Sequence, residues 1–209
     1  MKSVGTGLLA VVLLMGCSSD APRTGGESNP AKPAVKPPEY ESGRVALQRL
    51  YVTARQWSAD AQPFRLESQF TADSAAAEGK AGVWRASFAA PSRRAAKSYL
   101  WSGVTANDAP ERGITPGPED SFNPNNTSTH PFDLAFLKID TDQAFNTAQE
   151  HGGKAILAKT PDQPVIFLLD WNTQKNQLVW HVTYGASRAD AKLTVAVNAS
   201  TGEFLRVEK

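Results

Sequence analysis

Two segments of six residues, 96 positions apart, repeat one pattern of alternating side chains. Residues 83–88 read VWRASF and residues 179–184 read VWHVTY, so apolar and aromatic residues occupy every second position of both. A period of two is typical of a β-strand with one buried face. Further upstream, residues 62–66 (QPFRL) match residues 163–167 (QPVIF). This repetition predicts that one structural unit occurs twice along the chain, so the fold is expected to contain two similar units in tandem.

A helix is predicted at the start of each copy. In the first copy, Ser42 is a candidate N-cap, and apolar residues recur at helical spacing over residues 47–54. In the second copy, Asp140 and Gln143 have the spacing of a capping box, and glycines at 152–153 are expected to end the helix. Each copy therefore begins with an amphipathic helix.

Strand-like runs follow both helices and are joined by short connections. They cover residues 64–70, 83–88 and 95–101 in the first copy, and residues 165–171, 178–184 and 192–198 in the second. Strands joined by short connections are antiparallel. The expected fold class is α+β, with two tandem units that each contain one helix and a three-stranded antiparallel sheet.

The first residues of the chain have the features of an export signal. Lys2 precedes an apolar run over residues 8–15, which is too short to cross a bilayer because a spanning helix needs about 20 residues. The run ends in Leu-Met-Gly-Cys, which resembles the bacterial lipobox, and the resemblance implies lipid attachment at Cys17. Ser18 then implies an outer-membrane lipoprotein that faces the periplasm. The alternative is an ordinary signal peptide with an incidental Cys.

Five segments follow from these patterns. They are a lipoprotein signal peptide at 1–16, a disordered Pro-rich tether at 17–38, a first α+β unit at 39–102, a long loop at 103–131 and a second unit at 132–209. The loop contains five Pro, three Gly and four Asn, so it is either a crossover between the units or a binding loop. An ordered arm packed on the domain is the alternative to the tether.

The second unit resembles the PepSY domain over residues 139–207, and residues 42–102 resemble it more weakly. The closing run at 195–203 (VAVNASTGE) follows the family pattern V-x-V-D/N-A-x-T-G-E. The first copy lacks this closing motif and is expected to run into the loop after its third strand. The resemblance implies a module of cell-envelope proteins that binds proteins or inhibits peptidases, and it implies no catalytic residues.

One strand of the second copy is apolar on both of its faces. Ile166 and Leu168 stand where the first copy has charged or polar residues. Either the first copy or the loop covers them, or they line an exposed groove for a partner. Trp171, at the end of the same strand, is expected to be partly exposed. These three residues are the binding candidates.

Composition disfavours several classes of function. Lys and Arg number 22 against 21 Asp and Glu, and loss of Lys2 with the signal leaves them equal, so a nucleic-acid-binding face is not expected. None of His130, His151 and His181 pairs with another His, Cys or carboxylate at metal-ligand spacing, so neither a metal site nor a cofactor is predicted. His181 is expected to be a partly exposed strand residue.

Three functions remain open at this stage. The first is a non-catalytic lipoprotein that binds a protein partner in the cell envelope, with an envelope peptidase as a candidate, by strand addition at a sheet edge. The second is a structural or assembly lipoprotein that contacts cell-wall or lipid components. The third is a small hydrolase built from dispersed residues, although no nucleophile motif supports one.

The lipobox predicts where the protein resides in fractionated cells. We expect Cys17→Ala to move the protein from the membrane fraction to the soluble fraction, because the acyl chains would be absent. Ser19→Ala, which leaves the lipobox intact, should stay in the membrane fraction. A Cys17→Ala protein that still sediments with membranes would contradict lipid anchoring.

Overall fold

The structure, a computed structural model, describes residues 36–71 and 78–208 of the chain. The predicted signal peptide, Cys17 and most of the predicted tether lie outside the described residues.

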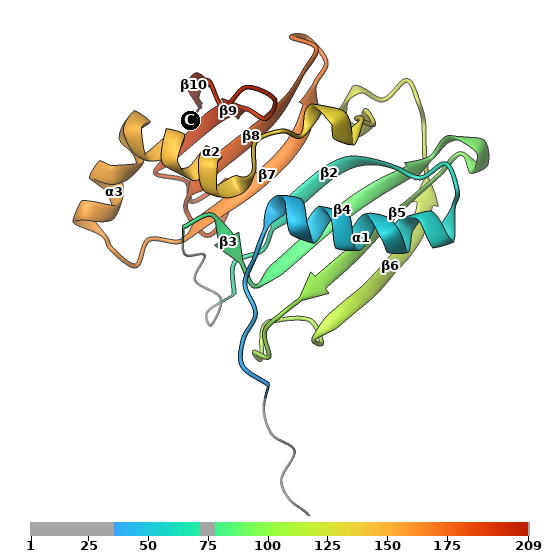
Figure 1. Cartoon of the computed structure of the whole chain (residues 1–209), viewed down its shortest axis with the longest axis horizontal. Helices are drawn as coiled ribbons and strands as arrows, with labels where there is room; N and C mark the ends of the chain where they lie inside the picture. The colour runs from blue at the N-terminus through green and yellow to red at the C-terminus, as the bar shows by residue number, and fades with distance from the viewer. Residues whose placement is uncertain (1–35, 72–77, 209) are drawn as a thin grey trace, which may run out of the picture. The chain divides into compact units, whose positions relative to one another are not determined.

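Eight strands form one antiparallel sheet in the order β10-β9-β8-β7-β2-β4-β5-β6 (Figure 1). The strands are β2 (Gln62–Ser68), β4 (Val83–Ala90), β5 (Ala95–Ser102), β6 (Gly113–Ser121), β7 (Val165–Asn172), β8 (Gln177–Tyr184), β9 (Leu193–Asn198) and β10 (Phe204–Glu208). Two further short strands, β1 (Glu41–Ser42) and β3 (Lys80–Ala81), pair with each other. A mixed α+β fold with a large antiparallel sheet is therefore confirmed.

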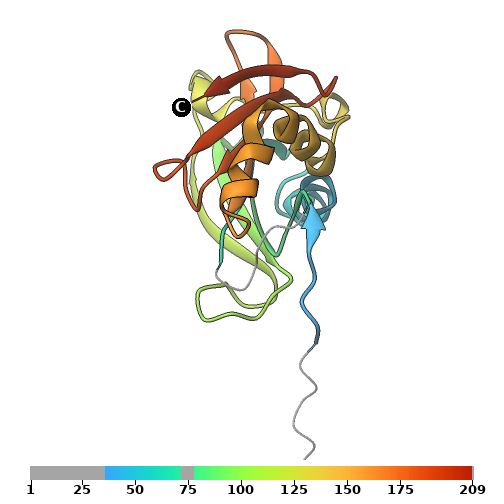
Figure 2. The same ribbon diagram turned by 90° about the vertical axis from the view of Figure 1, so that its left-hand side faces the viewer.

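The helices lie on one face of this sheet (Figures 1 and 2). They are α1 (Gly43–Trp57), α2 (Thr141–Ala148) and α3 (Lys154–Lys159), with single turns at η1 (Pro91–Arg93), η2 (Thr127–Thr129) and η3 (Leu134–Phe136). A distorted turn over Gln149–Gly153 separates α2 from α3. The helix breaks near the predicted place, because Gly152 has a φ of 113°, but α3 then continues it.

The prediction of two three-stranded sheets was wrong. Each half of the chain contributes four strands, and the halves share one sheet because their first strands, β2 and β7, pair with each other. The fourth strand of the first half, β6, lies inside the segment predicted to be a loop at 103–131. Its sequence GITPGPEDS has no apolar alternation, and prolines are tolerated because β6 is an edge strand.

The core lies between the helices and the sheet. Its large side chains come from both halves, and the fully buried ones include Leu47, Leu50, Leu66, Trp84, Phe88, Phe167, Leu169, Trp180 and Tyr184. Full burial of one such side chain contributes about 1.5–3 kcal/mol, so this layer provides most of the stability of the fold.

Asp140 joins the N-termini of α1 and α2. Its Oδ1 accepts hydrogen bonds from the backbone N of Arg44 at 2.9 Å and of Thr141 at 2.7 Å. Its Oδ2 accepts one from Ser42 Oγ at 2.6 Å. The capping box with Gln143 is confirmed. Ser42 makes no side-chain cap of its own helix, because its hydroxyl donates to Asp140 instead.

Equivalent tryptophans of the two halves meet at this joint. Trp84 Nε1 donates to the carbonyl of Glu41 at 3.0 Å, and Trp180 Nε1 donates to the carbonyl of Ile139 at 2.9 Å. Each bonded carbonyl lies one residue before Ser42 or Asp140. Both rings approach Gly43, where a Cβ atom would lie 2.6 Å from Trp180 Cη2. Only glycine leaves room for this contact.

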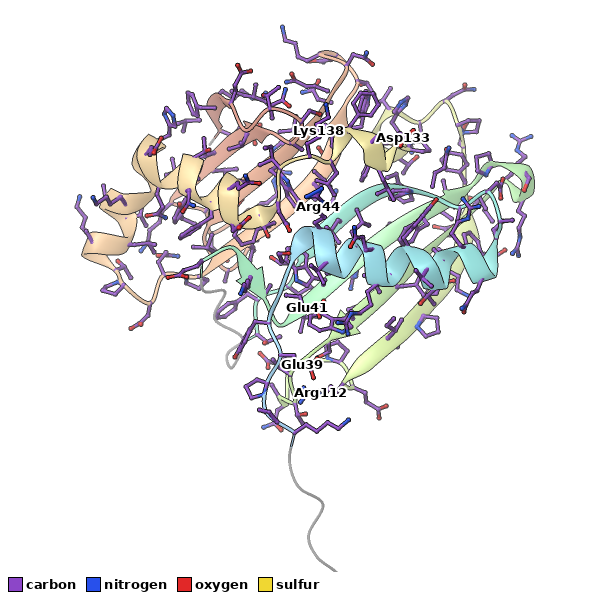
Figure 3. All side chains as sticks on the ribbon, viewed as in Figure 1. Glu39, Glu41, Arg44, Arg112, Asp133 and Lys138 are labelled. Carbon is purple, nitrogen blue, oxygen red and sulfur yellow. The ribbon has the colours of Figure 1, made fainter. Side chains whose placement is uncertain are left out.

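The start of the described domain is tied to the first half of the sheet. Glu39 donates its backbone N–H to the carbonyl of Gly103 at 2.9 Å, and its carboxylate pairs with Arg112 at 2.8 Å. Figure 3 shows Glu39 and Arg112 together, below Glu41 and Arg44 at the start of α1. These contacts fix Glu39 beside the end of β5.

The joint predicts a large effect of one substitution. We expect Asp140→Ala to lower the free energy of unfolding by about 1–4 kcal/mol, because each lost helix cap costs about 0.5–2 kcal/mol and two helices lose one. The matched control is Asp133→Ala, which removes a bond to Ala135 N at the single turn η3 and should cost less. Urea unfolding followed by tryptophan fluorescence measures both, and equal losses would contradict a shared cap.

Candidate functional site

The face of the sheet opposite the helices bears the candidate site. Side chains of β7 alternate between the two faces, so Phe167 and Leu169 enter the core while Ile166, Leu168 and Asp170 point to the other face. No helix of the described chain covers this second face, which we call the open face (Figure 2). The structure therefore brings Ile166 and Leu168 together, as predicted from their spacing.

Trp171, the third binding candidate, does not join them. It is partly buried, but it packs against the helix-side core and lies 5.1 Å from the ring of Phe136 and 5.9 Å from that of His130, centre to centre. Trp171 is partly exposed, as expected, but it lies on the face of the sheet opposite Ile166 and Leu168, because odd and even positions of a strand face opposite sides.

A groove of about 470 Å³ opens on the open face where the two halves meet. The pairing of β2 with β7 covers only Arg65–Glu67, after which Ser68 Oγ accepts a hydrogen bond from Phe167 N at 2.9 Å. The side chains that line the groove include Arg65, Glu67, Phe70, Ile166, Leu168 and Arg188. The first half lies beside the second in the sheet, and Phe70 of the first half and Asp108 of the predicted loop line the groove next to Ile166 and Leu168. Both segments that the sequence offered as covers therefore border these apolar residues.

The groove combines an apolar floor with a charged rim. Leu168 is 6% exposed and Ile166 is half-buried, so they form the floor. At the rim, Arg65 pairs with Glu67 at 3.0 Å, and Arg85 lies 3.7 Å from the same carboxylate. Exposed ion pairs of this kind contribute about 0.2–1 kcal/mol each. An apolar centre with a polar rim is the usual anatomy of a protein-binding surface.

A buried histidine with two carboxylates lies beside the groove. His181 on β8 is 7% exposed, and its Nε2 lies 3.2 Å from Asp170 Oδ1 on β7 while its Nδ1 lies 2.7 Å from Glu208 Oε2 on β10. Arg206 also pairs with Glu208, and Arg188 lies 3.8 Å from it. We call Asp170, His181 and Glu208 the β8 triad.

A protonated ring satisfies both contacts of the β8 triad. Ionised carboxylates only accept hydrogen bonds, so both ring nitrogens must donate, and only imidazolium has two N–H groups. Burial alone would lower the pKa of His181, but the bonds to Asp170 and Glu208 outweigh it and raise that pKa above its usual value. The bond from His181 lowers the pKa of Glu208 to about 2, against the opposing effect of burial.

Sequence reasoning missed the β8 triad and wrongly expected His181 to be partly exposed. Asp170 and His181 occupy diagonal positions on the open face of neighbouring strands, so strand parity and the register of the β7–β8 hairpin could have linked them. Glu208 could not be found this way, because β10 shifts its register relative to β9 between Phe204 and Arg206.

The chemistry available at the β8 triad is limited. Both nitrogens of His181 are engaged by carboxylates, so the ring has no free lone pair with which to accept a proton from a substrate. In the described part of the chain, no group of three or more His, Cys, Asp and Glu is arranged to hold a metal ion. The arrangement fits an electrostatic link between strands.

The two outer edges of the sheet differ. At one edge, β6 contains Pro116 and Pro118, and prolines discourage the addition of another strand. At the other edge, β10 is only five residues long and contains no proline. β10 lacks the prolines of β6, but its short length also limits strand addition at this edge.

Comparisons with known proteins identify a related fold and no family. No family model matches the sequence, and no curated protein matches it. The crystal structure of a protein named a putative lipoprotein, from Clostridium difficile 630, matches with a TM-score of 0.53 and 12% identity over 80% of this chain and 95% of that one. At this identity the likeness is one of fold alone, and the PepSY resemblance stays a prediction.

None of the described helices is both long and apolar enough to cross a membrane.

The β8 triad predicts how stability depends on pH. The raised pKa of His181 adds stability that is complete below about pH 6.5 and lost as the pH rises through the folded value. The lowered pKa of Glu208 adds stability above about pH 4.5 that is lost as the pH falls toward about 2. We therefore expect the free energy of unfolding to fall as the pH rises above about 6.5, and His181→Gln to lack this fall.

Urea titrations at a series of pH values measure this difference. His130→Asn is the matched control, because His130 lies against Trp171 on the helix side, and it should keep the alkaline loss of stability. An identical alkaline slope in the wild type and in His181→Gln would show that the triad is not responsible.

Proposed function

We propose that this chain is a non-catalytic lipoprotein of the bacterial cell envelope that binds a protein partner in the groove of the open face. The lipobox at Cys17 supports anchoring, and Ser18 supports an outer-membrane position facing the periplasm. The similar fold of a protein named a putative lipoprotein supports a lipid-anchored envelope protein.

The groove over Ile166 and Leu168 carries the binding proposal. A sheet face that only had to be solvated would bear polar side chains throughout, as the first half does at Arg65 and Glu67. The second half instead places apolar side chains in a hollow bounded by Arg65 and Arg188. Burial of Ile166, and of Phe70, which is 39% exposed, by a partner would remove apolar surface from water, which favours association.

An envelope peptidase is the partner class that we favour, with inhibition or regulation as the outcome of binding. The support is the resemblance of residues 139–207 to the PepSY domain. Both halves have a helix followed by a four-stranded meander. In each half, a Trp side chain donates a hydrogen bond to a backbone carbonyl just before the first helix. These shared features support two tandem PepSY-like units.

The other two functions have less support. A hydrolase would need a base with a free nitrogen or oxygen, whereas His181 is engaged on both sides. A structural lipoprotein that contacts cell wall or lipid would not need an apolar groove on its sheet. Wall or lipid contacts are therefore the outcome expected if groove variants have no effect on binding.

A variant of the groove tests the proposal directly. The full-length chain, purified from membranes, is used to capture crosslinked proteins from an envelope extract, and each captured protein is then purified and its affinity measured. We expect Ile166→Asp to weaken binding of the partner at least about tenfold, because a buried charge in the floor would be unpaired. If the partner is a peptidase, inhibition of its activity should weaken to the same extent.

The matched control is Val52→Asp, which places the same charge on the outer face of α1, where Val52 is 62% exposed. This variant should bind like the wild type. Hydrogen exchange of β5 verifies that both variants are folded. Equal affinity of the two folded variants would remove the groove from the proposal.

A further inference from the structure

The last strand of the sheet is held by few interactions. β10 pairs only with β9, and its register shifts between Phe204 and Arg206. Phe204 and Val207 are 37% and 53% exposed, so apolar burial holds this strand weakly. Leu205 is half-buried, and the side chain of Glu208 is only 14% exposed. The attachment of β10 therefore depends on Leu205 and on the carboxylate of Glu208.

His181 reaches this carboxylate from two strands away. In the register of the sheet, Ala196 on β9 lies between His181 on β8 and Arg206 on β10. The small side chain of Ala196 leaves room above β9 for the ring to reach Glu208, and the opposite nitrogen of the ring holds Asp170 on β7. One imidazole thus links β7, β8 and β10.

The charged groups at and around His181 include four positive and two negative ones when the ring is protonated. Asp170 faces it from β7, and Glu208 and Arg206 face it from β10. Arg188, from the connection between β8 and β9, lies 3.8 Å from Glu208, and Arg65 on β2 is the register partner of Asp170. The neighbours of the ring on β9 and on its own strand are uncharged: Val179, Thr183, Thr194, Ala196 and Asn198.

Loss of the ring proton removes one of these positive charges. A neutral imidazole has one N–H, so one of the two carboxylates would face a nitrogen lone pair at a position that is 7% exposed. Asp170 belongs to an eight-residue strand with neighbours on both sides, whereas Glu208 is in a five-residue edge strand. The strand that yields is therefore β10.

We infer that protonated His181 holds β10 on the sheet and that loss of the ring proton releases β10, an arrangement we call the clasp. Release of β10 leaves β9 as the edge of the sheet, and an extended segment of the partner can then pair with β9. The release step concerns this chain alone, and the addition step rests on the proposed function. Main-chain hydrogen bonds to β9 would then supplement contacts in the neighbouring groove. Partner binding by this route would strengthen as the pH rises.

Hydrogen exchange measures the release step without any partner. The test uses the full-length chain with His130→Asn and His151→Asn, which leaves His181 as its single imidazole. His151 must be replaced because its ring stacks on Phe204 at the other end of β10, with centres 3.7 Å apart. The titration of His181 is followed by its ring-proton NMR signals, and exchange of β10 is followed by mass spectrometry.

We expect the exchange of β10, corrected for the intrinsic rate, to rise by up to about tenfold per pH unit as His181 loses its proton. Exchange in β5 should not change. Glu208→Gln is the second variant, because an amide can either donate to or accept from Nδ1, so its bond does not require the ring proton. Exchange of β10 should then be independent of pH.

Two results would overturn the clasp. One is constant exchange of β10 throughout the titration of His181, and the other is an unchanged pH dependence in Glu208→Gln. Neither depends on the groove, because the readout is internal to the chain. Unchanged partner binding in Ile166→Asp, together with pH-dependent exchange of β10, would overturn the groove and would support the dependence of β10 on His181.

Discussion

The carboxylate of Asp140 is the interaction on which the arrangement of the two halves depends. The N-terminal ends of α1 and α2 both point at it, and each end has unpaired N–H groups and a positive dipole. Two positive helix ends at one place would repel each other without an anion between them. Because Asp140 fixes both helices, β2 and β7 lie side by side, and the missing side chain of Gly43 lets Trp84 and Trp180 meet above them.

The open face follows from this joint. Both helices use the same side of the sheet, so the other side has no helix to cover it. The halves join through only three residue pairs of β2 and β7, and the groove opens where this pairing stops. The groove therefore lies at the junction of β2 and β7, and the β8 triad of the second half lies beside it. The proposed binding and its proposed dependence on pH both arise from the way the halves are joined.

Local patterns predicted much of this structure and failed where register matters. Alternation identified the strands around Trp84 and Trp180 and placed Ile166 and Leu168 on one face. It missed β6, because Pro116 and Pro118 interrupt the pattern of an edge strand that needs no apolar face. It could not show that the halves share one sheet, since that depends on contacts around Asp140 that span 98 positions. The β8 triad was missed because it depends on the alignment of three strands.

Photo-crosslinking in living cells tests the central claim most directly. One protein has a crosslinking amino acid in place of Ile166 on the open face, and the other has it in place of Val52 on the helix side, and both keep the native anchor. The account predicts a single covalent adduct with one envelope protein from position 166 and none from position 52. Adducts from position 52 alone, or the same adducts from both positions, would contradict a binding site on the open face.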